Sequence, residues 1–218
     1  MIVEMHPYPY YSDNLKQNEP LHFFIANTFK SFQKEFDLMA SNLFMEPKKL
    51  EEQAFEQVDS SWLGLMNSAI VKYFGDDVTC LQEFTSLDNK ENKTRCDFMA
   101  RLLYPKTPID VLFEVKTQAE TKENLMLDFG FKNEKEQLRL YYKDARANYL
   151  KKAYAMPICF GVLGNSEMVK EAIKTYPKGY KEKNPLTDFC VIYHNTRKSK
   201  GLWVYGKINI PQGAIVYS

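Results

Sequence analysis

The most informative hydrophobic pattern lies between residues 109 and 118, where apolar and β-branched residues surround one carboxylate and one ammonium group. The run predicts a strand. Alternation along that strand puts Glu114, Lys116 and Gln118 on one face and the apolar residues between them on the other. We expect the apolar face to join a core and the charged face to form a site.

A second strand is predicted over residues 94–103, where Asp97 is a single acid among apolar neighbours. A hairpin through residues 104–108 would make the two strands antiparallel neighbours and bring Asp97 beside Glu114. We therefore expect Asp97, Glu114 and Lys116 to converge on one part of the sheet.

The remaining periodicity predicts an α/β or α+β fold, with a mixed sheet of about four to six strands and helices on both faces. The proline-rich residues 6–11 are expected to form an extended arm. Helices are predicted over residues 20–44, over 47–75 (continuous or broken near 59–61), from 134 until Pro157 ends it, and over 166–176. Further strands are predicted over residues 78–85, 158–163, 189–193 and 202–208.

Composition favours one domain, because 218 residues with 44% hydrophobic and 14% aromatic residues can bury a sizeable core. Within it we expect an arm and helix (1–46), a core (47–165), and a last helix with strands (166–218). The balance of 29 basic and 28 acidic residues gives no global field, so a nucleic-acid partner would need a local patch.

The four cysteines form no C-x-x-C pair, so reduced thiols are expected rather than zinc or redox chemistry. The N-terminal residues lack the pattern of a signal peptide, and no apolar run reaches the roughly 20 residues that span a bilayer. We expect an intracellular, cytoplasmic protein without a membrane partner.

Phosphodiester cleavage needs a hard divalent cation, which takes oxygen ligands from one or two carboxylates. Asp97 and Glu114 supply such ligands, and Lys116 supplies a cation for the developing negative charge. The spacing Glu-x-Lys is not specific, since it occurs four times in this chain. Only Glu114 lies in an apolar strand, and a structural ion pair is the alternative interpretation there.

The segment Arg95-Cys-Asp-Phe98 followed by Glu114-Val-Lys116 resembles the PD-(D/E)xK, or restriction-endonuclease-like, nuclease superfamily over roughly residues 50–165. The resemblance implies an αβββαβ core and Mg²⁺ (or Mn²⁺), held by Asp97, Glu114 and the Val115 carbonyl. Cys96 stands where the family has its proline.

In that family a glutamate from the first core helix commonly lies near the metal. Glu56, or else Glu52, could take this role, and both could equally be solvated acids. Gln118 could bind substrate or water, or be an ordinary polar residue at a strand end.

The segment Gln137-Leu-Arg-Leu-Tyr141 resembles a signature of the RecB-like exonuclease branch, which lies near the bound strand. Gln137, Arg139, Tyr141 and Lys143 are therefore candidates for binding nucleic acid, DNA being favoured over RNA. A solvated helix face is the alternative. Tyr154 could stack on an unpaired base or belong to the core.

The expected function is Mg²⁺-dependent hydrolysis of DNA. A catalytically inactive nuclease fold that binds nucleic acid or protein is the rival from another class, and a nuclease specific for RNA or a modified base is the rival enzyme. Assembly with a second copy or a partner protein is left open.

Overall fold

The fold is built on one seven-stranded mixed sheet. The structure is a computed structural model that describes residues 5–43, 59–85, 95–103, 108–120, 153–163, 167–170, 188–195 and 201–206. The strands are β1 (Met5–Tyr11), β2 (Val78–Thr85), β3 (Arg95–Leu102), β4 (Ile109–Glu120), β5 (Ala153–Leu163), β6 (Phe189–Asn195) and β7 (Gly201–Gly206).

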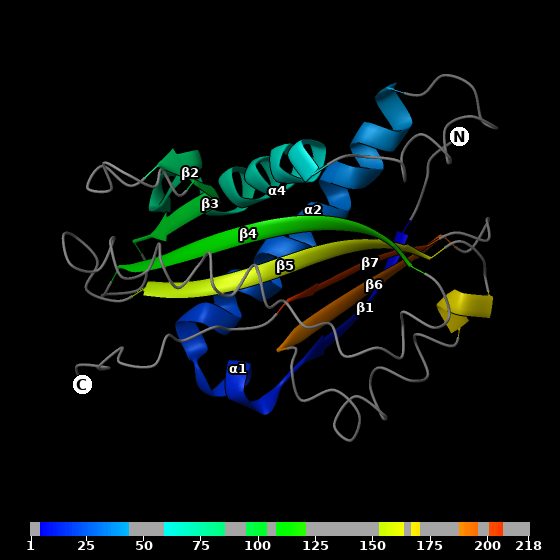
Figure 1. The fold of residues 1–218 in the computed structure, drawn as a ribbon, viewed down its shortest axis with the longest axis horizontal. Coiled ribbons are helices and arrows are strands. Elements are labelled where there is room, and N and C mark those ends of the chain that lie inside the picture. Colours follow the sequence, from blue (N-terminus) through cyan, green and yellow to red (C-terminus); the bar gives the residue numbers. More distant parts are fainter. Residues whose placement is uncertain are drawn as a thin grey trace.

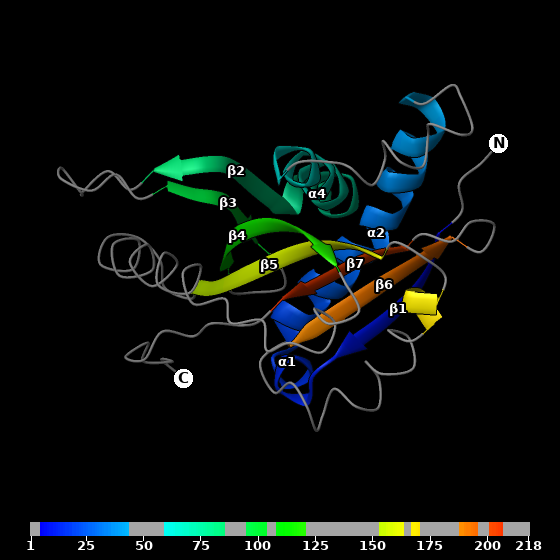
Figure 2. The ribbon, with the colours of Figure 1, turned by 45° about the vertical axis from the view of Figure 1, so that its right-hand side comes forward.

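The order of strands across the sheet is β1-β6-β7-β5-β4-β3-β2. Only β4 and β5 pair in parallel; every other neighbouring pair is antiparallel. The β2 and β3 strands form one edge region and β1 the other, as Figure 2 shows. The predicted mixed α/β class is confirmed, with seven strands rather than four to six.

The described helices are α1 (Asp13–Gln17), α2 (Glu19–Leu43) and α4 (Asp59–Phe74), followed by a short 3₁₀ helix, η1 (Gly75–Asp77). The predicted helix over residues 20–44 is confirmed, as is the end of the second helix at Gly75. That glycine has a φ of 56°, a left-handed conformation that ends α4 at little steric cost. Helices α2 and α4 run along the same face of the sheet (Figure 1).

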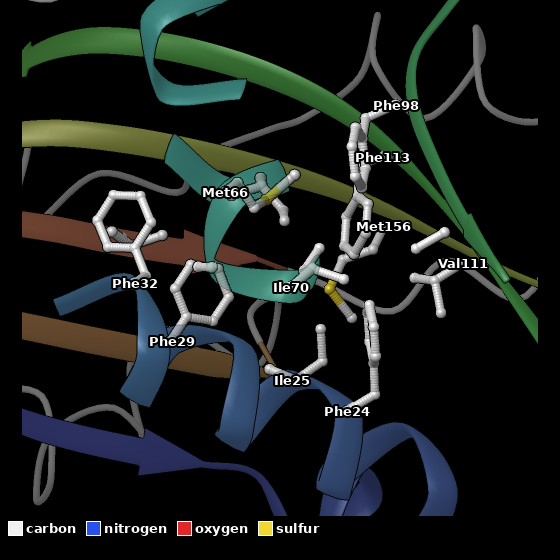
Figure 3. Close-up of a cluster of buried hydrophobic side chains, with 14 of the residues drawn as sticks. Phe24, Ile25, Phe29, Phe32, Met66, Ile70, Phe98, Val111, Phe113 and Met156 are labelled. Atoms are coloured by element: carbon white, nitrogen blue, oxygen red, sulfur yellow. The ribbon is translucent and has the colours of Figure 1, made fainter. Parts of the chain in front are cut away.

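Aromatic rings join these two helices to the sheet. Trp62 of α4 stacks on Phe160 of β5 with ring centroids 5.1 Å apart, and Phe32 of α2 lies 5.5 Å from the same Phe160 ring. Nearer β4, Phe24 of α2 stacks on Phe113 at 6.2 Å (Figure 3). The helix-facing side of the sheet is therefore a continuous apolar core.

The N-terminal arm is extended, as expected, and it is also an edge strand of the sheet, which the sequence does not predict. Residues 5–11 form β1 and pair along their whole length with β6. Pro7 and Pro9 are two residues apart, so both nitrogen atoms face the same side. A proline has no N–H to donate, and an edge strand tolerates this on its open side.

Strand β5 begins earlier than expected. The helical spacing in the sequence places residues 153–156 at the end of a helix, whereas the structure places them in β5. They are paired in parallel with β4 from Ala153 onward. Tyr154 is buried, and its hydroxyl lies 2.8 Å from the amide of Asn18. Of the two interpretations of Tyr154, the place in the core is therefore confirmed, and stacking on a base is wrong. Tertiary packing of alternate residues overrides the helical spacing here.

The helices predicted for the second face of the sheet fall mostly outside the described residues. Of the helix predicted over residues 166–176, only residues 167–170 are described, and they are helical. Among the described helices, none combines the length and the apolar character needed to cross a bilayer.

We predict that Tyr193→Phe lowers the free energy of unfolding by about 1 kcal/mol, the usual contribution of one buried hydrogen bond. The fully buried Tyr193 hydroxyl donates to the Phe29 carbonyl at 2.6 Å and so ties β6 to α2. Urea unfolding followed by circular dichroism measures the change. Tyr73→Phe is the matched control, because Tyr73 is 45% exposed; an equal loss in both variants would contradict the account.

Candidate functional site

The candidate site lies where β4 separates from β3. The antiparallel register runs from Leu102 opposite Ile109 to Phe98 opposite Phe113 and ends there, although both strands continue. One residue further, the Asp97 carboxylate accepts a hydrogen bond from the Val115 backbone N–H at 2.8 Å. The expectation that a β3 and β4 hairpin brings Asp97 to the segment containing Glu114 is confirmed.

Cys96 makes the second contact across this junction. Its thiol donates to the Phe113 carbonyl and to the Phe98 carbonyl, each at 3.3 Å. Burial raises the pKa of the Cys96 thiol to about 12, and the nearby charges of Glu114 and Asp97 also raise it. Both carboxylates therefore contribute to the raised pKa of this buried thiol.

The two carboxylates differ in exposure. Glu114 is only 2% exposed, whereas Asp97 is half-buried. Val111, Phe113 and Val115 belong to the core cluster, as predicted for their face of β4. The other face of β4 is also covered, since Leu112 is fully buried. Of the two acids, Asp97 on β3 is therefore the more accessible to solvent.

The oxygen atoms at this junction are of the chemical kind that hard divalent cations prefer. Asp97 and Glu114 supply carboxylates, and the N–H and C=O of one strand residue point to the same edge, so the Val115 carbonyl faces β3 as its N–H does. Such cations bind through one or two carboxylates and keep several waters. Among the described residues, no cluster of three or more His, Cys, Asp or Glu side chains is placed to hold a metal.

The other predicted site residues cannot be placed as fully. The backbone of β4 continues through Lys116, opposite Cys159, and Gln118, opposite Gly161. The side chains of Lys116 and Gln118 lie outside the described part of the chain. The same holds for all of the remaining candidates: Glu52, Glu56, Gln137, Arg139, Tyr141 and Lys143.

A second polar pair on this face was not recognised in the sequence. Arg101 lies opposite Asp110 and binds its carboxylate with two nitrogens, Nε at 2.6 Å and Nη2 at 3.0 Å. The hydrogen bond to Asp110 raises the pKa of the Arg101 guanidinium. The pair could have been recognised from strand alternation and the register of the hairpin. Arg101 lies four residues from Asp97 on β3, Asp110 lies four residues from Glu114 on β4, and all four share one face of the sheet.

Three described cysteines, Cys80, Cys96 and Cys190, are reduced thiols, as the sequence predicts. Cys96 and Cys190 are buried, and Cys80 is partly exposed. Cys96 makes structural contacts at the junction, and its raised pKa makes it a poor nucleophile.

No protein-family model, no curated protein and no solved structure matches this chain.

We predict that Mn²⁺ raises the melting temperature of the protein, because a cation that binds only the folded state stabilises it. At about 100 times the dissociation constant the rise should be roughly 5 to 10 °C for a chain of this size. Differential scanning fluorimetry measures it. Glu114→Gln should abolish the rise and the exposed control Glu19→Gln should retain it. Equal rises in both variants would place the cation elsewhere.

Proposed function

We propose that this chain is a divalent-metal-dependent nuclease of the PD-(D/E)xK type that hydrolyses phosphodiester bonds in DNA. One observation carries the proposal: the Asp97 carboxylate reaches across from β3 and binds the backbone of β4 beside Glu114, directly before Lys116. Two acids and a lysine thus follow one another in the order and on the strands that the superfamily pattern requires.

The order of elements supports the same proposal. Helix α4 precedes the antiparallel strands β2, β3 and β4, and β5 returns parallel to β4. A parallel return requires a crossover, commonly a helix, and the segment between β4 and β5 is where the sequence predicts one. This arrangement agrees with an αβββαβ core, to which β1, β6, β7 and α2 are additions.

In the proposed chemistry, a few groups bind the cation, stabilise charge and contact the substrate. Asp97, Glu114 and the Val115 carbonyl would hold the cation, with Glu56 as a further candidate ligand. When bound, the cation polarises the phosphate and lowers the pKa of a water. Lys116 stabilises the negative charge that develops on the phosphate and positions the attacking water. Gln118, two residues further along β4, is a candidate for hydrogen-bonding the substrate.

A binding-only module with the same fold is the second candidate. The burial of Glu114 favours it, since a carboxylate that is 2% exposed offers little surface to a cation from solvent. This candidate predicts nucleic-acid or protein binding that depends neither on metal nor on Lys116.

We predict that the purified protein cleaves labelled DNA in Mg²⁺ or Mn²⁺ and that Lys116→Ala lowers the rate by about 10²- to 10⁴-fold, the usual contribution of one positioned charged group. Single- and double-stranded DNA and RNA of one sequence are assayed in parallel by gel electrophoresis. The RNA lanes test the alternative substrate directly.

Lys34→Ala is the matched control, because Lys34 is an exposed lysine of α2, on the helix side of the sheet. It should cleave as the wild type does. Asp97→Asn is preferred to alanine at that position, since asparagine can still accept the Val115 N–H. Binding of DNA without metal-dependent cleavage, unchanged in Lys116→Ala, would favour the binding-only module.

A further inference from the structure

We infer that Arg101, held by the buried carboxylate of Asp110, is a phosphate-binding residue that positions a nucleic-acid strand along β3 toward the acids at Asp97 and Glu114. The inference rests on the proposed nuclease function and adds to it the side from which the substrate approaches. It concerns two residues that the superfamily pattern does not include.

The position of Arg101 relative to the site follows from the sheet. Asp97 and Arg101 are four residues apart on β3, so their Cα atoms are separated by about 13 Å at roughly 3.3 Å per residue. Alternation puts both on one face, and the intervening residues Ala100 and Phe98 belong to the core on the other. Along β3, the distance from Arg101 to the acids thus corresponds to the length of a few nucleotides.

The charged residues that share this face differ in exposure between β4 and β3. On β4, Glu114 is 2% and Asp110 3% exposed. On β3, Asp97 is half-buried and the Arg101 side chain is 39% exposed. The two more exposed of these four groups therefore lie on β3, with the buried Met99 between them on the same face.

The neighbouring strand β2 is exposed on the face that carries Arg101. Thr79 and Leu81 of β2 stand opposite Arg101 and Met99 in register and so share their face. Both are exposed, Leu81 by 42%, and Leu103 beyond Arg101 is exposed by 51%. The surface around Arg101, at the sheet edge formed by β2 and β3, is thus accessible and carries the positive charge of that side chain.

The geometry of the ion pair suits a phosphate. A guanidinium has five N–H donors in a planar fork, and Asp110 occupies one at Nε and one at Nη2. Three donors remain for a second anion, and the buried carboxylate fixes their direction. An arginine that served only to neutralise Asp110 would not need an exposed outer edge.

The test measures DNA binding by fluorescence anisotropy at several salt concentrations, with Ca²⁺ in place of Mg²⁺, and DNA cleavage kinetics in Mg²⁺. Arg101→Gln should weaken binding about tenfold at low salt, the effect of losing a charged hydrogen bond. It should also reduce the slope of log affinity against log salt by about 1, as expected for one lost phosphate contact. In cleavage, KM should rise while kcat changes little.

Three further variants separate binding from folding. Arg101→Gln leaves the buried Asp110 without its cation, so the double variant Arg101→Gln with Asp110→Asn provides a neutral pair and should show the same losses. Arg101→Lys keeps the charge and should retain the salt slope with weaker affinity. Lys34→Gln, a charge removed from the helix side, should match the wild type.

An unchanged salt slope and KM in the folded double variant, with cleavage intact in the wild type, would overturn this inference and leave the proposed function standing. Absence of both binding and cleavage in the wild type would overturn the proposed function and this inference with it.

Discussion

Beyond the pair of Phe98 and Phe113, β4 no longer pairs with β3 but stays in parallel register with β5 as far as Glu120. Backbone donors and acceptors left at such a divergence need partners. Asp97 supplies one by accepting the Val115 N–H, and Cys96 supplies the other by donating to the Phe113 carbonyl. The hydrogen bond that gives the Val115 N–H a partner thus also fixes the position of the Asp97 carboxylate. The proposed cation site is therefore a consequence of the way in which the two strands diverge.

The rigidity of that junction comes from the opposite face of the sheet. Helices α2 and α4 cover it through stacked rings such as Trp62 on Phe160 and Phe24 on Phe113. Phe113 directly precedes Glu114 and faces this core, so the packing that stabilises the domain also holds the strand that carries the acid. A site supported in this way keeps its geometry without a ligand, which is what a metal centre requires.

Hydrophobic periodicity predicted the helices α2 and α4, six of the seven strands and the meeting of Asp97 with the segment of Glu114. Hydrophobic periodicity did not predict the features that depend on contacts between residues far apart in the sequence. The edge strand β1 is specified by pairing with β6, and its two prolines hide the strand signal. The start of β5 is specified by pairing with β4 against a helical spacing. The pair of Arg101 and Asp110 required the hairpin register, and the burial of Glu114 depends on what covers β4, which local pattern does not contain.

The central claim is that Asp97, Glu114 and the Val115 carbonyl form one cation site at the divergence of β3 and β4. Anomalous scattering from a crystal of the protein soaked in Mn²⁺ tests it most directly. The account predicts a peak within coordination distance of an oxygen of each of the three residues, lost in a crystal of Glu114→Gln. A fully occupied Mn²⁺ bound elsewhere, with none at this junction, would contradict it.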